Sequence, residues 1–266
     1  MDFSKLKYTK EPLKRKLKSV AKKNLIKKGQ KKLTFSVKSQ LYTKPVGVLS
    51  GNLIFVLSGG EKREKNFLNE LINQKFRSLR VAFMSKKGQG LHPFQMQDVW
   101  DNIRKDKVIK ISNINYRLTT IDKVFLLTDV DEFYNQLVEI LNKKRKEDNG
   151  HWIISNPCFE IWLYYCFLCN PKEDLAYLSS LNVKDRSKKL KNMTHNLVPG
   201  GLDPRKAFQY IKEGIKNSLQ YFEKDENNIP KLFSTNMHEM AEYIYNILEQ
   251  NKNEYSKFKE NQKTNF

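Results

Sequence analysis

The sequence predicts an α/β fold with a mainly parallel sheet flanked by helices. Short apolar runs alternate with segments of helical spacing between residues 53 and 170. Such alternation is typical of parallel strands that are joined by helical crossovers. Hydrophobic residues make up 39% of the 266-residue chain and aromatic residues 12%, so the chain can bury a sizeable core.

Four apolar runs are the predicted strands, namely residues 53–57, 79–84, 124–127 and 152–154. The first of them ends in Ser58-Gly59-Gly60. A short apolar run that ends in glycines indicates a buried parallel strand and its turn. We therefore expect ligands to bind beyond the carboxyl ends of these strands.

Helical spacing predicts helices over residues 61–76, 93–103, 132–146 and 159–167. In the second of these, Phe94, Val99 and Ile103 are expected to face the core. The segment from residue 171 onwards is mostly polar, with further helices expected near 203–223 and 235–250. We expect three parts: a basic N-terminal extension over residues 1–50, an α/β core over 51–170 and a helical C-terminal region over 171–266.

The charge of the chain predicts an anionic partner. The net charge is +20, and residues 1–50 hold fifteen Lys and Arg against only Asp2 and Glu11. Nucleic acid is the commonest partner of such a surplus, and an anionic membrane is the next. The alternative is a high isoelectric point without a functional meaning.

Two basic segments are the predicted nucleic-acid contacts. A helix in the extension is expected either to follow phosphates or to dock an apolar stripe, which includes Leu13 and Leu17, on the core. A second basic cluster spans residues 184–191 and could equally be a solvated helix face. The residues selected are Lys14, Arg15, Lys16, Lys18, Lys22, Lys23, Lys188 and Lys189.

Cysteine usage and hydropathy favour a cytoplasmic protein. Cys158, Cys166 and Cys169 are odd in number and cluster in one apolar stretch, which is not a disulfide framework. No stretch reaches the ~20 apolar residues of a membrane span, and no apolar run follows the basic N-terminus as in a secretory signal. We expect no membrane association and neither a haem nor a nucleotide cofactor.

The strongest local signal is a pair of carboxylates after the third predicted strand, Asp129 and Asp131. Residues two apart in extended backbone point the same way, and two carboxylates aimed together repel each other unless a cation lies between them. Mg²⁺, or Mn²⁺ in its place, suits such oxygen ligands. The alternative is that one of the aspartates caps the following helix.

Three glutamates are further candidates. Glu61 and Glu64 lie in the first helical turn after Gly59-Gly60, where a phosphate could approach the backbone. Their alternative role is a favourable interaction with the helix dipole. Glu160 lies inside an apolar stretch and, if buried, needs a metal, a cation or a water-lined site. The alternative is one exposed position on an amphipathic helix.

Five segments, in the same order, resemble the RloB-like family of bacterial defence-associated proteins, which have a Toprim-type core. Ser155-Asn156-Pro157-Cys158-Phe159-Glu160-Ile161-Trp162-Leu163 is similar to the family's Ser-Asn-Pro-x-Phe-Glu-x-Trp-Leu signature. Residues 128–133 resemble its Asp-x-Asp strand end, and residues 60–67 resemble its Gly-x-x-Thr-Glu turn. Gly90-Leu91-His92-Pro93 is similar to the loop before its second helix, and residues 234–238 to its Ser-Thr-x-x-His element.

The chain departs from the family at two positions. Toprim enzymes carry a glutamate directly before the first glycine after the first strand, where this chain has Ser58 or Gly59. Arg63 stands where the family often has threonine. By motif matching, Glu64 is the preferred substitute for the missing carboxylate, with Glu61 as the second choice.

The resemblance implies a Mg²⁺-dependent nuclease that hydrolyses phosphodiesters of DNA or RNA in a bacterial defence or abortive-infection context. A partner ATPase is a further expectation of that context. The expected catalytic residues are Glu64, Glu61, Asp129, Asp131 and Glu160, and the expected metal ligands are Asp129, Asp131 and Glu64. The alternative is a non-catalytic nucleic-acid-binding or regulatory module on a degenerate Toprim-like core, which the missing glutamate favours.

Overall fold

The computed structural model describes residues 41–42, 52–73, 78–87, 90–111, 114–143, 150–253, 256 and 260. Residues 40–266 make up one compact unit. The predicted basic extension lies outside the described residues except for the two-residue strand β1 (Leu41–Tyr42). Its predicted helix and its six selected Lys and Arg residues therefore stay predictions.

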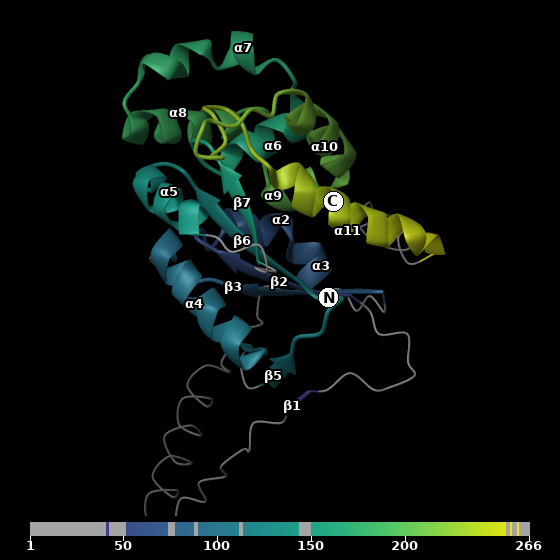
Figure 1. Ribbon diagram of the computed structural model, residues 1–266. Helices are drawn as coiled ribbons and strands as arrows, with labels where there is room; N and C mark the ends of the chain where they lie inside the picture. Colours follow the sequence, from purple (N-terminus) through teal and green to yellow (C-terminus); the bar gives the residue numbers. More distant parts are fainter. Residues whose placement is uncertain are drawn as a thin grey trace, which may run out of the picture. The chain divides into compact units, whose positions relative to one another are not determined.

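A four-stranded, all-parallel sheet forms the centre of the fold (Figure 1). Its strands are β2 (Asn52–Ser58), β3 (Leu79–Met84), β6 (Lys123–Asp129) and β7 (Gly150–Ser155), in the order β3-β2-β6-β7. Leu57 pairs with both Met84 and Leu126, and Asp129 pairs with Ser155. The carboxyl ends of neighbouring strands thus lie together, and the predicted α/β class with a parallel sheet is confirmed.

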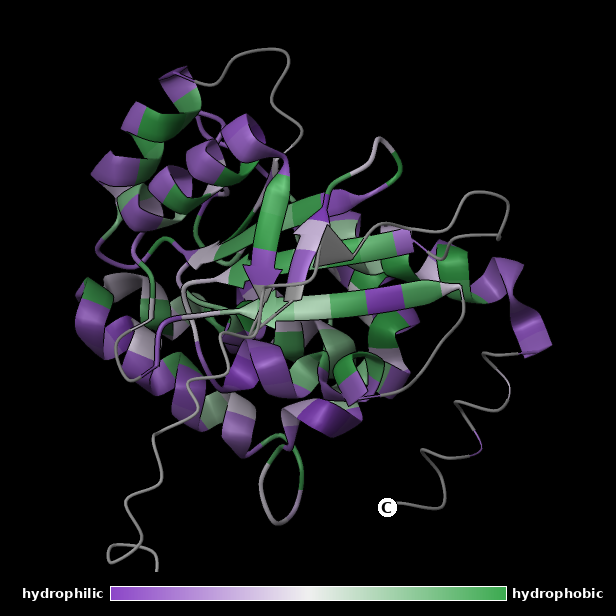
Figure 2. Cartoon of the chain, turned by 90° about the horizontal axis from the view of Figure 1, so that it is seen from below, coloured by the Kyte–Doolittle hydropathy of each residue, from purple (hydrophilic) through white to green (hydrophobic). Residues whose placement is uncertain are grey.

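Side chains of β2 alternate between two hydrophobic cores. Ile54 and Val56 belong to one core, whereas Phe55 and Leu57 belong to the other. Because side chains along a strand point alternately to opposite faces, a sheet that is covered on both faces needs an unbroken apolar run. Figure 2 shows these strands in hydrophobic colours, with hydrophilic residues on the helices around them.

Six of the described helices pack on one face of the sheet, and two of them approach each other closely at a glycine. A Cβ atom on Gly214 would lie 2.8 Å from the ring of Trp162 and 2.9 Å from the sulfur of Cys166. Glycine at this position therefore permits the close approach of α10 to α6. The six helices are α2 (Arg63–Phe67), α3 (Asn69–Asn73), α6 (Glu160–Phe167), α9 (Pro204–Ala207), α10 (Ile211–Gln220) and α11 (Met237–Gln250).

Two helices, α4 (Pro93–Asp106) and α5 (Tyr134–Lys143), cover the other face. In α4 the buried side chains are Met96, Trp100 and Ile103. Phe94 and Val99, which were expected to face the core, are only partly buried at its margin. The helix starts at Pro93. The buried residues follow it at intervals of three, four and three positions, which places them on one face of the helix.

Some elements differ from the predictions. The helix expected over residues 61–76 is interrupted at Leu68 between α2 and α3. A second sheet, β1-β5-β4, contains β4 (Val108–Ile111) and β5 (Ile114–Arg117), neither of which was predicted. Further short elements are α7 (Pro171–Asp174), the 3-10 helices η2 (Ala176–Ser180) and η3 (Phe208–Tyr210), and the longer α8 (Val183–His195).

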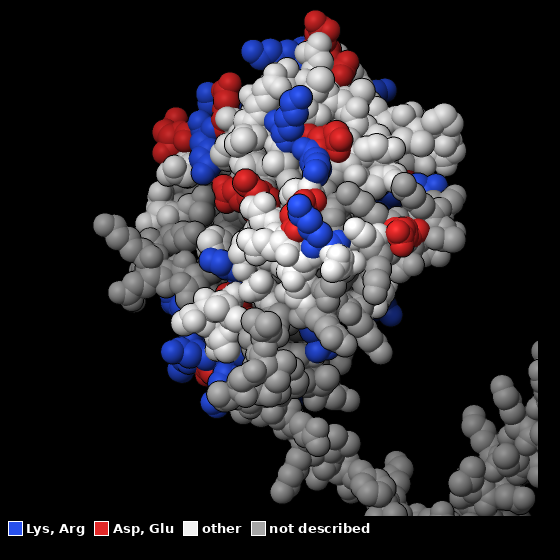
Figure 3. All heavy atoms as spheres, turned by 90° about the vertical axis from the view of Figure 1, so that its right-hand side faces the viewer, with Lys and Arg blue, Asp and Glu red and all other residues white. Residues whose placement is uncertain are grey.

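Two surface properties bear on partners. Among the described residues, no helix combines the length and the apolar character that a membrane crossing requires. On the face shown in Figure 3, lysines and arginines are interspersed with acidic residues. The positive surplus of the chain is therefore not gathered into one basic patch on the described part of this face.

Candidate active site

The turn after β6 presents Asp129 and Asp131. The amide of Val130 donates to the carbonyl of Ser155 (2.9 Å), and the amide of Asp131 donates to the carbonyl of Pro157 (3.1 Å). Asp131 has a φ of +24°, a strained value for a residue with a side chain. The α5 helix begins only at Tyr134, beyond both aspartates. The turn is thus held by the last residue of β7 and the segment that follows it, rather than by a capping interaction with α5.

Glu64 reaches the same edge of the sheet from the start of α2. A Cβ atom on Gly60 would lie only 1.9 Å from Oε1 of Glu64, so the carboxylate lies directly against the glycine. Its side chain is 8% exposed. The α2 helix begins at Arg63, which leaves Glu61 before the helix and partly exposed. Glu64 is therefore the better placed of the two glutamates.

Glu160 is buried at the start of α6, and a cation accompanies it. The side chain of Glu160 is 2% exposed, and its Oε1 lies 2.8 Å from Nη1 of Arg63, which is 37% exposed. The first turns of α2 and α6 are thereby joined by an ion pair. Glu160 is not an exposed position of an amphipathic helix, and Arg63 supplies the charge partner that its burial requires.

The α8 helix contributes two residues that the sequence did not single out. The hydroxyl of Ser187 donates to Oδ1 of Asp131. One turn later, Lys191 lies near Glu160, Asp129 and Asp131. Its positive charge acts to lower the pKa of both aspartates, against the larger effect of their burial. Residues four apart share one face of a helix, so this face of α8 points at the acids. The predicted Lys188 and Lys189 are exposed instead.

Burial and the repulsion between carboxylates raise the pKa values of Glu64, Asp129 and Asp131. Burial raises the pKa of Glu64 to about 7, and the charge of Glu160 adds to the shift. The pKa of Asp129 lies well above its ordinary value because of burial and then the charges of Glu64, Glu160 and Asp131. For Asp131, burial also raises the pKa, although the Ser187 hydrogen bond opposes the shift. The four carboxylates thus form one electrostatic cluster.

The cluster has the donor chemistry of a Mg²⁺ site. Four carboxylates face two cations, Arg63 and Lys191, so full ionisation leaves two negative charges. One divalent cation would balance that excess and remove the repulsion that raises the pKa values. Within the described ranges, however, no three His, Cys, Asp or Glu side chains form a ready-made metal-binding group. Binding would therefore require side-chain adjustment, with Glu64, Asp129 and Asp131 as the ligands.

A pocket of about 330 Å³ opens beside the cluster. Asp129 and Asp131 line this pocket, whereas Glu64 and Glu160 do not. Gly60 lines it, and Glu64 lies directly against that glycine. The full lining is Gly59, Gly60, Thr128, Asp129, Asp131 and Phe133 from the strand ends, with Lys86, Gly90, Leu91, His92 and Gln95 from the segment that leads into α4.

A comparison with protein families agrees with the motifs on which this site is built. The model of the family described as RloB-like protein matches residues 54–244. The chain belongs to the RloB-like protein family. This match confirms the family that the sequence motifs predicted. No curated protein and no solved structure matched the chain.

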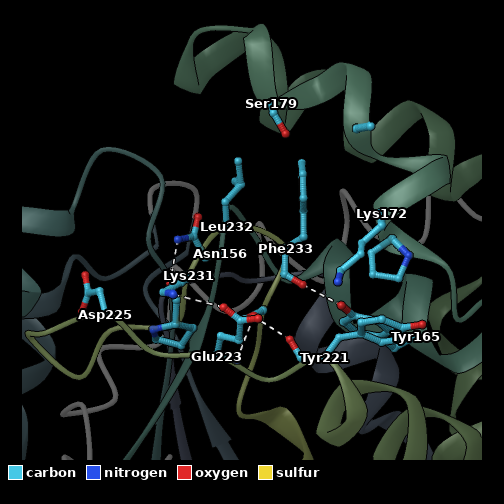
Figure 4. Close-up of a pocket in the computed structure, with 14 residues that line it drawn as sticks. Asn156, Tyr165, Lys172, Ser179, Tyr221, Glu223, Asp225, Lys231, Leu232 and Phe233 are labelled. Atoms are coloured by element: carbon cyan, nitrogen blue, oxygen red, sulfur yellow. Dashed lines mark hydrogen bonds and ion pairs between the residues drawn. The ribbon is translucent and has the colours of Figure 1, made fainter.

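A larger cavity among the described residues of this RloB-like chain, of about 660 Å³, is lined by none of the predicted acids. It lies between α7, η2 and the segment 221–234, and Figure 4 shows Lys231 and Glu223 pointing toward each other there, 3.1 Å apart. The Tyr165 hydroxyl donates to the carbonyl of Phe233, and Asn156 donates to that of Pro230. Several polar groups of this cavity are therefore satisfied by one another.

The C-terminal family element, residues 234–238, has a structural role next to the site. Asn236 accepts from the amide of Ile154 (2.6 Å) and donates to the carbonyl of Trp152 (2.9 Å), so it pairs with the free edge of β7. The hydroxyls of Thr235 and Ser155 are 2.9 Å apart. These contacts fix the segment whose carbonyls hold the turn of Asp129 and Asp131.

Proposed function

We propose that this RloB-like protein is a Mg²⁺-dependent nuclease that hydrolyses phosphodiester bonds of DNA or RNA. The observation that carries the proposal is the cluster of Glu64, Asp129, Asp131 and Glu160 at one edge of a parallel sheet, whose four carboxylates outnumber the two neighbouring cations. A carboxylate cluster with two neighbouring cations is poor at binding an anion by itself. A bound divalent cation would turn it into a site for phosphate.

The residues of the cluster take different parts in this proposal. Glu64, Asp129 and Asp131 are the proposed ligands, and Mn²⁺ is an acceptable substitute for Mg²⁺. When bound, the metal supplies Lewis-acid chemistry at a phosphodiester. Glu160, held by Arg63, is a positioning residue that adds negative charge to the ligand cluster. Glu61, which lies outside α2, keeps only the subsidiary role of a second candidate.

The partner and its context belong to the same proposal. The charge of +20 supports a nucleic-acid partner, and the basic residues at 1–50 are the proposed non-specific contacts. The family resemblance supports a Toprim-type core, a role in bacterial defence or abortive infection, and a partner ATPase. A cytoplasmic location is consistent with three cysteines that form no disulfide.

A second candidate function is a non-catalytic nucleic-acid-binding or regulatory module. Two observations favour it: Ser58 and Gly59 stand where Toprim enzymes carry a glutamate, and no ready-made metal-binding group is found in the described part of the chain. In this case the acids would serve to set local structure and charge, and nucleic acid would bind without being cut.

Cleavage assays decide between the two. Single- and double-stranded DNA and RNA are incubated with the full chain in Mg²⁺, in Mn²⁺ and in EDTA, together with the Asp129→Asn variant. The nuclease proposal expects metal-dependent cleavage of at least one substrate by the wild type and none by the variant. Binding without cleavage in every metal would support the second candidate.

A further inference from the structure

The pocket beside the carboxylates has a second wall, which the proposed function does not use. Lys86, His92 and Gln95 line this wall, opposite in charge character to Asp129 and Asp131. Gly90, which also lines the pocket, lies in close contact with the glycine turn after β2. A Cβ atom on Gly90, which has a φ of +70°, would lie 1.9 Å from the carbonyl oxygen of Gly59. The wall is thus built into the fold at a point where glycine is required.

The capping of α4 determines which atoms of this wall remain available. His92 and Gln95 form a capping box: Nδ1 of His92 accepts from the amide of Gln95, and Oε1 of Gln95 accepts from the amide of His92. An imidazole that accepts on Nδ1 carries its hydrogen on Nε2, and an amide that accepts on oxygen keeps its NH₂ group. Each side chain therefore uses its acceptor atom in the cap, while the Nε2–H of His92 and the NH₂ of Gln95 remain as donors.

A cation completes the set. Lys86 is exposed, lines the pocket and forms no ion pair with any residue that the structure describes. Together the wall offers an ammonium group, an imidazole N–H and an amide NH₂. Among the described residues these three donors have no acceptor, and a tetrahedral oxyanion such as phosphate can accept from all of them.

We infer that Lys86, His92 and Gln95 form a phosphate subsite, which holds one backbone phosphate of the nucleic acid beside the carboxylate cluster. The inference rests on the proposed function for the identity of the phosphate, but the donor set is independent of cleavage. His92 and Gln95 act here as binding residues, in addition to capping α4. The carboxylates across the pocket repel an anion, so phosphate affinity should rise when a divalent cation is present.

Substitutions in α4 and in the segment before it test the subsite. Gln95→Glu keeps the side-chain acceptor of the capping box but replaces the donor NH₂ with a negative oxygen. Gln97→Glu adds the same charge to α4 outside the pocket lining and is the matched control. His92→Asn keeps a good N-cap residue while removing the imidazole N–H. Lys86→Ala is compared with Lys87→Ala, its exposed neighbour.

The readout is the affinity of a fluorescein-labelled single-stranded oligonucleotide in Mg²⁺, measured by anisotropy, with inorganic phosphate as a competitor. Gln95→Glu, His92→Asn and Lys86→Ala should each weaken binding by about tenfold or more, because each removes a hydrogen bond to a charged group. The controls should stay within about twofold of the wild type. Thermal midpoints and Mg²⁺ titrations of all variants establish that fold and metal affinity are unchanged.

The outcomes separate the subsite from the nuclease proposal. If Gln95→Glu binds and cleaves like Gln97→Glu, the subsite is wrong while the nuclease proposal stands. If inorganic phosphate binds in a manner that depends on Gln95 but no nucleic acid is cut, the subsite stands and the nuclease proposal fails. A wild type that binds neither oligonucleotide nor phosphate overturns the subsite.

Discussion

Arg63 and Glu160 form an ion pair of 2.8 Å between the first turns of two helices that are far apart in the sequence. By the motif match, Arg63 stands where the family pattern has threonine, and it brings a positive charge next to a buried acid. Glu160 is one of the residues in the central family motif. The pair thus joins the segment that carries this motif to the turn after β2.

Breaking this pair should destabilise the metal-free protein. Arg63→Gln leaves Glu160 buried without its partner, and removal of one member of a buried pair costs about 3 kcal/mol or more. The partial exposure of Arg63 puts the expected loss at the lower end. The double variant Arg63→Gln/Glu160→Gln should recover most of the lost stability, since position 160 then holds no buried charge that needs Arg63. Urea unfolding in EDTA measures all three; equal stability of Arg63→Gln and wild type would contradict the pair's role.

Glu64 and Glu61 should differ sharply in their contribution to metal binding. Glu64→Gln removes a charge from the carboxylate that lies against Gly60 and should weaken Mg²⁺ binding by about tenfold or more. Glu61→Gln, which precedes α2, should change the affinity by less than about threefold. Isothermal titration of both variants tests this order, with their thermal midpoints as the control for folding. Reversed effects would assign the ligand role to Glu61.

The metal-free protein should lose stability as the pH rises from about 4.5 to 7. Folding raises the pKa of Glu64 from 4.5 to about 7, so its protonated form is favoured in the folded state. The contribution of Glu64 to the free energy of unfolding is complete below pH 4.5. It is lost as the pH rises through the folded-state pKa of about 7. Asp129 and Asp131 shift in the same direction.

Thermal unfolding in EDTA between pH 5 and pH 8 measures this effect. The midpoint temperature is expected to fall by on the order of 5 °C as the pH rises. Saturating Mg²⁺ should reverse the trend, because metal ligands must be deprotonated to bind. The Glu64→Gln variant cannot ionise and should show a smaller slope in EDTA. A metal-free midpoint that rises over this range would contradict the raised pKa values.

Removal of residues 1–46 should weaken nucleic-acid binding and flatten its dependence on salt. This segment holds most of the positive surplus of the chain, and each phosphate contact that is lost reduces the slope of log affinity against log salt by about one. Anisotropy at several salt concentrations measures the slope, and circular dichroism shows whether the remainder folds. An unchanged slope would exclude the segment as a phosphate contact.

The sheet and the acids at its edge could be predicted because each leaves a local signal. The strands are unbroken apolar runs, and Glu64, Asp129 and Glu160 lie in motifs that the family orders in the same way. The contact between Glu64 and Gly60 is possible because the glutamate side chain is long and the glycine has no side chain. Such features need only neighbouring residues, which the sequence displays directly.

Other features could not be predicted because they depend on tertiary contacts. Ser187 and Lys191 reach the acids only because α8 docks over the strand ends, and a basic cluster on a polar helix gives no direction for its side chains. The strands β4 and β5 lack long apolar runs, and the break at Leu68 lies inside an uninterrupted helical pattern. In α4, the buried face consists of Met96, Trp100 and Ile103 rather than of the expected Phe94 and Val99, because the orientation of the helix depends on its packing against the sheet.

The central claim is that the acidic cluster binds one divalent cation, which would balance the two negative charges that remain when all four carboxylates are ionised. Calorimetric titration of the full chain with Mg²⁺ and Mn²⁺, beside the Asp129→Asn variant, tests it most directly. We predict about one ion per chain for the wild type, from the charge balance of the cluster, and no measurable binding by the variant. Equal binding by both proteins, or none by the wild type, would contradict the claim.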